Sequence, residues 1–552
     1  MNKYSGPNDP RFQSGSGFFE VIGLGAGVGA IVGYCAAWET VALARGVGLL
    51  TPSSIWSAIH QVGVFPPYLS LPLAVGAAFG LACGAGLGLF VGNISAEIHI
   101  RGSQLTRKAN ILQNAILAAS PPVHGKNQGI RIHPKIQTTE ALETSHLLIM
   151  GGSGAGKTTI LWPMINQIIK RGDKAIIFSY KGDFEQKIGT GDIIGKQFAL
   201  LAPWDNRSAL WALGKDIRTR LDAEALAATL IPEPNGGSND PMWINGSRSL
   251  IVGIVSDIQR EYGEKWGFAE LAKRISEALS DFSILRKIIE KESPHVANII
   301  AGGAENRTTS SFLATVSSYM TNVINLGVAA HDLKVQASGK QWSVNRWLSD
   351  LSKIPKITIL GFRPSAKALS QAFCASVIEQ IVLKLSDLPD VSPERRRIWL
   401  ILDEVPRLGK VPSITEALEV LRSKGVRLIL GAQGIDQIEE VYSKNTARSW
   451  TTQTATKVFG RITDPESQRF AAGIIGEHEL ERYHRGSGST DRGSYQRTKE
   501  HVVLPSQLGQ ILKFTRKGPR AIFQVAGSDH IVSVVSQIDG SLVKLYEGQT
   551  AA

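Results

Sequence analysis

Two long runs without charged residues stand near the start of the chain. The first covers residues 21–38 (VIGLGAGVGAIVGYCAAW), and the most apolar part of the second covers residues 68–92 (YLSLPLAVGAAFGLACGAGLGLFVG). Runs of this length can cross the hydrocarbon core of a bilayer as helices. A secretory signal peptide is the alternative for the first run, but no small-residue cleavage site leads from it into a polar chain. The pattern therefore predicts two transmembrane helices, over residues 18–39 and 68–92.

Glycine spacing and flanking charges add detail to this predicted hairpin. Glycines recur every fourth residue in both runs, at positions 25, 29 and 33 and at positions 76, 80, 84, 88 and 92. Small residues on one face allow membrane helices to pack closely, although general tolerance of glycine in such helices gives the same pattern. Lysine and arginine flank the outer ends of both runs, whereas residues 46–66 between them contain neither. The positive-inside rule then places both ends of the hairpin, and the body of the chain, in the cytoplasm.

Beyond about Ser103 the pattern changes to short apolar runs that alternate with helix-periodic stretches. Strand-like runs cover residues 146–150, 174–178, 357–361, 398–402, 426–430 and 454–459, and helical patterns cover residues 160–170, 367–385, 414–424 and 465–474. Strands that alternate with helices form a doubly wound, mostly parallel sheet, with ligands at the carboxyl ends of the strands. The expected fold class is therefore α/β.

Strand-like runs become scarce between about Asn206 and Asn325. Helical stretches follow one another there, at residues 223–230, 247–262, 267–278, 283–291 and 308–324. About a hundred residues is an ordinary size for a domain. We therefore expect an all-α domain over residues 206–325, inserted into a sheet domain formed by residues 103–205 and 326–552. Residues 1–102 form the membrane region.

One glycine-rich loop connects a predicted strand to a predicted helix. Its sequence matches the pattern G-x-x-x-x-G-K-[ST], in which glycines let backbone N–H groups turn toward phosphate oxygens at a helix N-terminus. The lysine of such a loop reaches the β- and γ-phosphates, and the hydroxyl after it coordinates Mg²⁺. The predicted nucleotide-binding residues are Gly151, Gly152, Ser153, Gly154, Ala155, Gly156, Lys157, Thr158 and Thr159.

A pair of carboxylates follows another apolar run, Ile398 to Leu402. Asp403 is predicted to hold Mg²⁺ together with Thr158, and Glu404 to polarise the attacking water. Gln433, just past the run 426–430, is predicted to sense the γ-phosphate or position water, although an ordinary loop glutamine is the alternative. Arg422 is a candidate arginine finger for a neighbouring subunit, with a solvated helix-face arginine as the alternative. The predicted catalytic residues are Lys157, Glu404, Gln433 and Arg422, and the predicted cofactors are ATP and Mg²⁺.

The charge balance is basic, with 60 lysines and arginines against 48 acidic residues and a formal net charge of +12. This is compatible with nucleic acid or anionic lipid as a partner. Nine basic residues gather around the segment 486–494 (GSGSTDRGS), at positions 482, 485, 492, 497, 499, 513, 516, 517 and 520. Basic groups and interleaved aromatics suit a loop that faces single-stranded DNA, and a solvated surface loop is the alternative. The three cysteines are too scattered for a metal site or a disulfide framework.

Taken together, these features resemble one protein family. The two membrane helices, HLLIMGGSGAGKTT, SYKGDF, the helical insertion and LILDEVPRLG followed by GAQ are similar to the type IV coupling proteins, the TraD- and TraG-like ATPases of bacterial conjugation and type IV secretion. The resemblance implies a RecA-like motor domain in a homo-hexamer that is anchored in the bacterial inner membrane. It also implies that single-stranded DNA, a relaxase, membrane lipid and components of the secretion channel are its partners.

The resemblance also bears on the site residues. Lys157, Thr158, Asp403, Glu404 and Gln433 match nucleotide-site positions of that family, and Arg422 falls where the family places its finger. Two other functions stay open at this point. One is a double-stranded DNA translocase of the FtsK type, although no long low-complexity linker or C-terminal winged helix is visible. The other is a membrane receptor for secreted proteins that uses ATP as an assembly switch.

Overall fold

The computed structural model describes residues 97–119, 128–187, 198–233, 241–336, 340–349, 354–484 and 494–536, apart from two isolated positions before them. Both predicted membrane helices, and residues 485–493 of the glycine- and serine-rich segment, lie outside these ranges. The described part divides into two compact units. The first unit contains residues 97–102 and 477–500, and the second contains the other described residues from 103 to 536.

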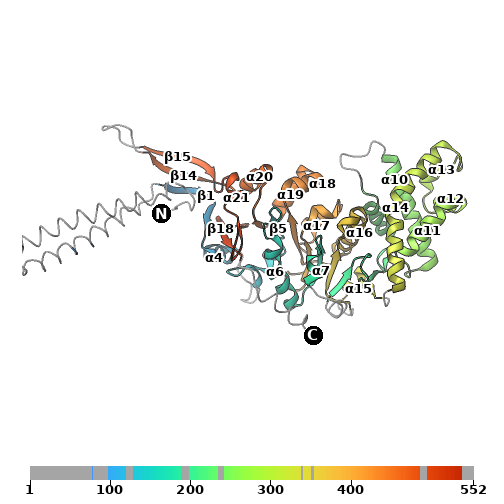
Figure 1. The fold of residues 1–552 in the computed structure, drawn as a ribbon, viewed down its shortest axis with the longest axis horizontal. Helices are drawn as coiled ribbons and strands as arrows, with labels where there is room; N and C mark the ends of the chain where they lie inside the picture. Colours follow the sequence, from blue (N-terminus) through green and yellow to red (C-terminus); the bar gives the residue numbers. More distant parts are fainter. Residues whose placement is uncertain are drawn as a thin grey trace, which may run out of the picture. The chain divides into compact units, whose positions relative to one another are not determined.

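A mixed, mostly parallel sheet forms the centre of the second unit (Figure 1). Its seven central strands are mutually parallel, in the order β7 (Phe198–Leu201), β10 (Ile357–Gly361), β6 (Lys174–Ser179), β11 (Ile398–Leu402), β12 (Val426–Ala432), β5 (Leu147–Met150) and β13 (Thr456–Phe459). Beyond β13 the sheet continues with β17 (Gly518–Val525), β18 (His530–Val535) and β2 (Gln104–Thr106), and β16 (Phe514–Thr515) pairs with β17. Strand β17 pairs antiparallel with β13, and β18 pairs antiparallel with β17.

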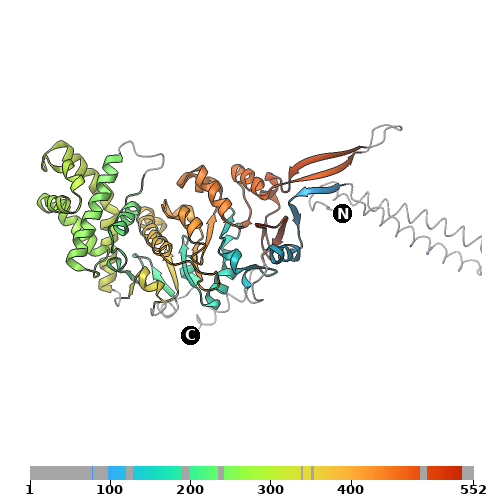
Figure 2. The ribbon, with the colours of Figure 1, turned by 180° about the vertical axis from the view of Figure 1, so that it is seen from behind.

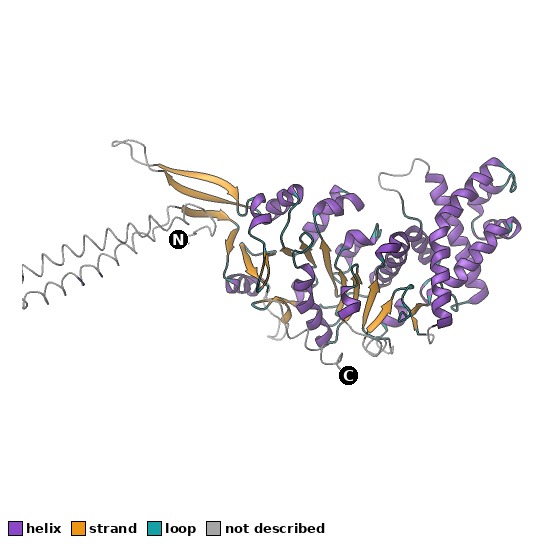
Figure 3. Cartoon of the chain, in the orientation of Figure 1, coloured by secondary structure: helices purple, strands orange, loops and turns teal. Residues whose placement is uncertain are grey.

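The central strands are continuous apolar runs because both faces of the sheet are covered by helices. All residues of β5, β10, β11 and β12 are buried. Helices α6 (Lys157–Arg171) and α7 (Asp183–Lys187) lie on one face, as Figure 3 also shows, and one core cluster joins α6 to β5, β6, β11, β12 and α4 (Ala109–Ala119). The other face carries α16 (Lys367–Ser386), α17 (Ile414–Val420), α18 (Ile435–Val441), α19 (Lys444–Gln453) and α20 (Pro465–Ile475).

Smaller elements complete the sheet region. They are the hairpin of β3 (Gln128–His133) and β4 (Ile136–Thr139), α5 (Glu140–Glu143), α15 (Val344–Leu348), α21 (Pro505–Gln510), and the 3₁₀ turns η4 (Pro364–Ala366) and η5 (Val405–Leu408). Within the described part of the chain, one helical stretch, Pro364–Ser386, is long and apolar enough to cross a membrane. Its most apolar window is 72% buried inside the protein, as expected of a core helix.

A run of helices interrupts the sheet between two very short strands. The chain leaves β8 (Leu210–Trp211) and returns at β9 (Gln341–Trp342), which pairs with β8 in parallel. Between them lie α8 (Leu213–Asp216), α9 (Arg220–Leu230), α10 (Pro241–Tyr262), α11 (Phe268–Ser280), α12 (Phe282–Glu292), η3 (Pro294–Val296), α13 (Ala297–Ile300) and α14 (Arg307–Gln336). Figure 2 shows α10 to α14 gathered as one bundle, coloured green to yellow. The last helix extends well beyond the predicted helical stretch 308–324.

Helix α9 fastens this insertion to the sheet region by packing against α16. The Asp222 carboxylate accepts a hydrogen bond from Lys384 Nζ at 2.6 Å, and its carbonyl accepts one from Gln380 Nε2 at 3.0 Å. Asp216 is fully buried and accepts bonds from the Trp211 indole and from two N–H groups that begin α15. Buried carboxylates with several donors hold their partners in one geometry.

The first unit is a three-stranded sheet in the order β1 (Glu97–Gly102), β14 (Glu477–His484) and β15 (Ser494–His501). Cross-strand ion pairs involve several of its basic residues. Arg482 lies 2.7 Å from Glu500, Arg497 lies 3.3 Å from Glu481, and Lys499 pairs with Glu477. The basic residues of these two strands are thus matched by carboxylates, whereas the sequence alone grouped them into one basic segment.

Candidate active site

The glycine-rich loop lies at the carboxyl end of β5, where the sequence places it. Gly154 and Gly156 have φ values of 72° and 87°, a left-handed conformation that glycine adopts at little cost. The loop is fastened on both sides, because Gly151 N–H donates to Ala432 O at 3.1 Å and Gly152 N–H donates to Arg461 O at 2.7 Å. Its start is therefore held by β12 and by the segment after β13.

The loop opens directly into α6, which begins at Lys157. A hydrogen bond runs from Ile160 N–H to Gly156 O, so the N–H groups of Lys157, Thr158 and Thr159 come before the helical ladder. Such N–H groups, together with the helix dipole, favour a bound anion. The loop and the first turn of α6 therefore form a cradle suited to phosphate.

The side chain of Lys157 joins the loop to the carboxylate pair. Its Nζ atom donates to Gly151 O at 2.7 Å and lies 3.6 Å from Glu404 Oε2. Burial lowers the pKa of Lys157 from its ordinary value, and the negative charges of Glu404 and Asp403 oppose that change. An ammonium group held between the loop and a carboxylate is placed to meet a phosphate.

Asp403 and Glu404 leave the end of β11 as nearly buried carboxylates, with residue exposures of 8% and 3%. Within the described residues, Asp403 Oδ1 and Glu404 Oε1 are buried without a hydrogen-bond partner. Burial raises the pKa of Asp403 to about 6, with Glu404 adding to the rise and Lys157 opposing it. Buried oxygens without partners are costly, and carboxylate oxygens are ligands that Mg²⁺ accepts. These residues therefore fit a hydrated Mg²⁺ beside a phosphate chain, and the half-buried Thr158 follows Lys157 in the first turn of α6.

Strand β12 lies between β5 and β11, so Gln433, which follows it, leaves the sheet between the two halves of the site. Gln433 is half-buried. The preceding strand is pressed against β11, because a Cβ atom on Gly431 would lie 1.9 Å from Asp403 O. This close approach of the two backbones brings the end of β12, which Gln433 follows, beside Asp403.

Arg422 is not brought to this site. It is exposed and lies in the turn between α17 and β12, at the amino end of the strand, whereas Gln433 lies at the carboxyl end. Its charge acts instead on His146, whose pKa is lowered to about 4 chiefly by burial. The predicted helix to Lys424 is wrong, because α17 ends at Val420 and a turn through Gly425, with φ of 72°, leads into β12. A role of Arg422 in a neighbouring subunit stays a prediction.

Two charged residues that the sequence did not assign to the site act on it. Lys181 lies in the turn after β6 and Asp183 is the first residue of α7, and β6 is the neighbour of β11. Asp183 raises the pKa of Asp403 and Lys181 lowers it. Beside them the Arg407 guanidinium lies 5.3 Å from the centre of the Tyr180 ring. The signal in the sequence was a polar turn after a buried strand, but the order of the strands in the sheet was needed to interpret it.

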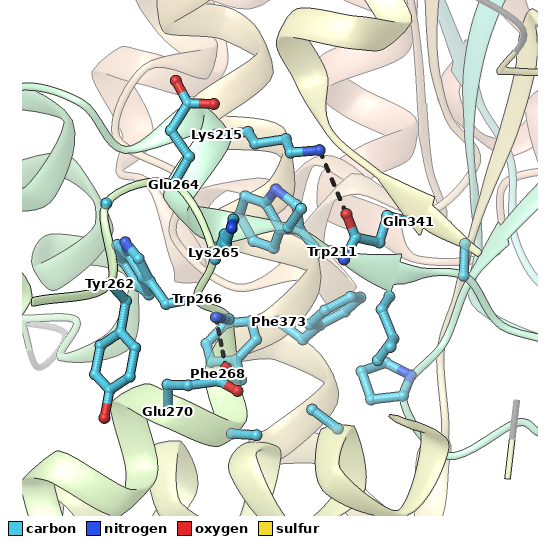
Figure 4. Close-up of a pocket in the computed structure, with 18 residues that line it drawn as sticks. Trp211, Lys215, Tyr262, Glu264, Lys265, Trp266, Phe268, Glu270, Gln341 and Phe373 are labelled. Carbon is cyan, nitrogen blue, oxygen red and sulfur yellow. Dashed lines mark hydrogen bonds between the residues drawn. The ribbon is translucent and has the colours of Figure 1, made fainter. Parts of the chain in front are cut away.

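A hollow of about 710 Å³ lies elsewhere, where the helical insertion meets β8 and α16 (Figure 4). None of the predicted site residues lines it. Several of its polar groups are already paired: Lys215 Nζ donates to Gln341 Oε1 at 3.3 Å, and Gly267 N–H donates to Glu270 Oε2 at 2.8 Å. The indoles of Trp211 and Trp266 are buried and also hydrogen-bonded. This hollow is therefore separate from the loop and the carboxylates.

Comparison with known proteins gives a family match over most of the chain. Residues 130–518 match the family model described as the type IV secretion-system coupling protein DNA-binding domain. The coupling protein TraD of Escherichia coli is 27% identical over 359 residues, which cover 64% of this chain and 47% of TraD. VirD4 of Agrobacterium fabrum is 24% identical over 371 residues, which cover 65% of this chain and 53% of VirD4. The chain thus spans about half the length of these curated relatives.

Solved structures of the conjugative coupling protein TrwB share the fold. Unbound TrwB gives a TM-score of 0.64 at 21% identity, covering 80% of this chain and 94% of the TrwB chain. TrwB in complex with ADP and Mg²⁺ gives 0.62 at 23% identity, with the same two coverages. At this level of identity the likeness establishes the α/β fold with its mixed, mostly parallel sheet.

Proposed function

The chain belongs to the type IV secretion-system coupling protein family, and we propose that it is an ATPase that drives single-stranded DNA toward a secretion channel. The observation that carries the ATPase part is the approach of Lys157 Nζ to Glu404 at 3.6 Å, beside two buried carboxylate oxygens that have no hydrogen-bond partner among the described residues. A phosphate cradle, an ammonium and two carboxylates are the groups that phosphoryl transfer from ATP requires. A TrwB structure holds ADP and Mg²⁺, which supports the same ligands here.

Each residue of the site has a separate role in hydrolysis, which its position determines. The N–H groups of the loop and the first turn of α6 bind phosphate oxygens, and Lys157 neutralises charge that develops on them. Thr158 and Asp403 would hold Mg²⁺, which neutralises phosphate charge when bound. Glu404 accepts a proton from, and orients, the attacking water, and Gln433 contacts the terminal phosphate from between the strands. Arg422 lies at the opposite end of β12 from the nucleotide site of its own subunit, so we propose that it acts on the nucleotide site of a neighbouring subunit.

The wider setting follows from the family and the sequence pattern. We propose a RecA-like motor in a homo-hexamer, tethered to the bacterial inner membrane by helices over residues 18–39 and 68–92, with its body in the cytoplasm. The sheet domain is formed by residues 103–205 and 326–552, and the all-α domain by residues 206–325. Membrane lipid, single-stranded DNA, a relaxase and channel components are the proposed partners. The family description as a DNA-binding domain supports the DNA part.

The test is ATP hydrolysis by the full chain in detergent, alone and with single- or double-stranded DNA. We expect single-stranded DNA to stimulate turnover. We expect Lys157→Ala to lower turnover by a factor on the order of 10² to 10³, and Lys170→Ala, on the exposed side of the same helix, to leave it unchanged. Stimulation by double-stranded DNA alone would favour the FtsK-type translocase. Hydrolysis that responds to neither DNA would favour the ATP-switched receptor for secreted proteins.

A further inference from the structure

A short hairpin near the end of the described chain packs against the phosphate-binding loop. Phe514 of β16 pairs with Pro519 at the start of β17, and the turn between them contains Arg516 and Lys517. A Cβ atom built on Gly156 would lie 2.5 Å from Pro519 Cβ and 3.3 Å from Phe514 Cε2. The hairpin therefore touches the last residue of the loop before α6 begins.

The two hairpin residues at this contact differ in exposure. Pro519 is buried, but 50% of Phe514 is exposed. Singly exposed aromatic side chains are ordinary on protein surfaces, so exposure alone assigns no role to Phe514. Phe514 is not on an ordinary surface, because its ring edge lies against the loop that forms the phosphate cradle. Its neighbours Lys513, Arg516 and Lys517 are exposed cations.

The order of the strands gives the direction in which a bound nucleotide must extend. Lys157, Asp403 and Glu404 mark the end of the site where the terminal phosphate reacts, and they face β12 and β11. On the other side of β5 the sheet continues with β13 and β17. A triphosphate whose terminal phosphate lies toward β11 places its ribose and base toward β13 and β17. Phe514 presents an exposed aromatic ring on that side.

We propose that Phe514 is the platform on which the base of the bound nucleotide stacks, and that the β16–β17 hairpin is the wall of the nucleotide site. This inference rests on the proposed function, because it requires a nucleoside triphosphate on the loop at Gly151–Gly156. Stacking on an aromatic ring does not depend on the identity of the base, so Phe514 contributes affinity for nucleotides in general. The proposal also assigns part of the stretch 482–520, whose basic residues suggested a DNA-facing loop, to nucleotide binding instead of DNA binding.

The experiment compares two ligands of the full chain in detergent by calorimetry: the non-hydrolysable ATP analogue AMP-PNP, and inorganic tripolyphosphate, each with Mg²⁺. The second ligand has the phosphates but no base. We expect Phe514→Ala and Phe514→Leu to weaken AMP-PNP binding about tenfold, and Phe514→Tyr to retain it within about twofold. Binding of tripolyphosphate should stay within about twofold in all three variants, because no stacked base is lost. Phe514→Leu keeps an apolar side chain against Gly156 and so separates stacking from packing.

Two results would overturn the inference while leaving the proposed function intact. One is unchanged AMP-PNP affinity in Phe514→Ala, which would point to another contact for the ring, such as a second copy of the chain. The other is an equal loss for both ligands, which would mean that Phe514 only shapes the loop. If Lys157→Ala and the unaltered chain bind AMP-PNP alike, the nucleotide site itself is wrong, and the inference fails with it. Tyr262→Ala, an exposed aromatic at the end of α10, is the matched control and should change neither affinity.

Discussion

Lys157 Nζ lies 3.6 Å from Glu404 Oε2, although the two residues come from distant parts of the chain. Both side chains are largely buried, with side-chain exposures of 10% and 4%. Two opposite charges so far from solvent depend on each other, and removing one leaves the other uncompensated. The pair therefore connects the glycine-rich loop to the end of β11 in both structure and chemistry.

Replacing Glu404 with glutamine should separate nucleotide binding from turnover. Glu404→Gln keeps the shape of the side chain but removes the base that orients water, so we expect hydrolysis to fall by a factor on the order of 10² or more. Binding of ATP should persist, since the phosphate cradle is unaltered. Steady-state hydrolysis and AMP-PNP titration measure the two effects. Glu440→Gln, exposed on α18, is the control, and equal turnover in the two variants would contradict the role of Glu404.

Gly431→Ala should disturb the sheet at the centre of the site. The added Cβ would lie 1.9 Å from Asp403 O, so β11 and β12 must move apart. We expect a loss of about 3 kcal/mol in the free energy of unfolding, with reduced turnover because Asp403 shifts. Chemical denaturation measures the stability. Gly473→Ala in α20 is the opposite case, because nothing lies within 4 Å of its added Cβ. Gly473→Ala should stabilise the protein by about 0.5–1 kcal/mol. A change of the free energy of unfolding in the same direction in both variants would contradict the close packing of Gly431 on β11.

His146 should make the stability depend on pH. Its Nδ1 atom accepts a hydrogen bond from Leu428 N–H at 3.1 Å, and its other ring nitrogen lies 3.1 Å from Leu418 O, so the neutral ring fits and a second ring proton would face a donor. The pKa is lowered to about 4 in the folded protein, chiefly by burial. Between about pH 6.5 and 4 the unfolded chain therefore binds more protons than the folded one. His146 then lowers the free energy of unfolding by about 3 kcal/mol as the pH falls through this window.

The measurement for His146 is a difference between two proteins, because other groups titrate in the same range. The free energy of unfolding is followed from pH 7.5 to pH 4.5 for the unaltered chain and for His146→Asn. Asparagine tolerates the left-handed φ of 61° found at this position. We expect the variant to be less stable at neutral pH and to lose less stability on acidification. Parallel pH profiles would show that His146 does not titrate with a lowered pKa.

Arg422→Ala tests action between subunits. Because Arg422 is exposed at the amino end of β12, its loss should leave ATP binding intact but abolish turnover if it completes a neighbouring site. Mixing this variant with Lys157→Ala should restore part of the turnover, since some interfaces then combine an intact loop with an intact arginine. Arg395→Ala is the matched control, an exposed arginine just before β11 at the same edge of the sheet. If no mixing ratio restores turnover, the finger assignment is wrong.

The strands that carry the site could be predicted from the sequence because each is a continuous apolar run. The run 398–402 is the observed β11, and the run 146–150 contains the observed β5, Leu147–Met150. The predicted strand 426–430 is extended by Gly431 and Ala432, since close packing on β11 requires a small residue there. The glycine-rich loop and the carboxylate pair could be predicted for the same reason, because each directly follows such an apolar run.

What the sequence could not give is which elements become neighbours. The hydrophobic periodicity of a segment indicates which of its residues are buried. The order of strands in a sheet, in contrast, depends on tertiary packing. Lys181 and Asp183 belong to the surroundings of Asp403 because β6 lies beside β11. Phe514 lies against Gly156 because the chain adds antiparallel strands beyond β13. The basic residues 482–520 looked like one segment, yet they are divided between two units of the structure.

The pairing of β8 with β9 has a consequence for how such a chain can diverge. The helical insertion leaves and re-enters the sheet region through one ladder of two residue pairs, Leu210 with Gln341 and Trp211 with Trp342. Its two ends are therefore neighbours in space, whatever length of chain lies between them. Descendants of an ancestral gene can lengthen, trim or exchange that segment while every strand around Lys157 and Glu404 keeps its place. Selection can thus change the insertion and the catalytic machinery at separate rates.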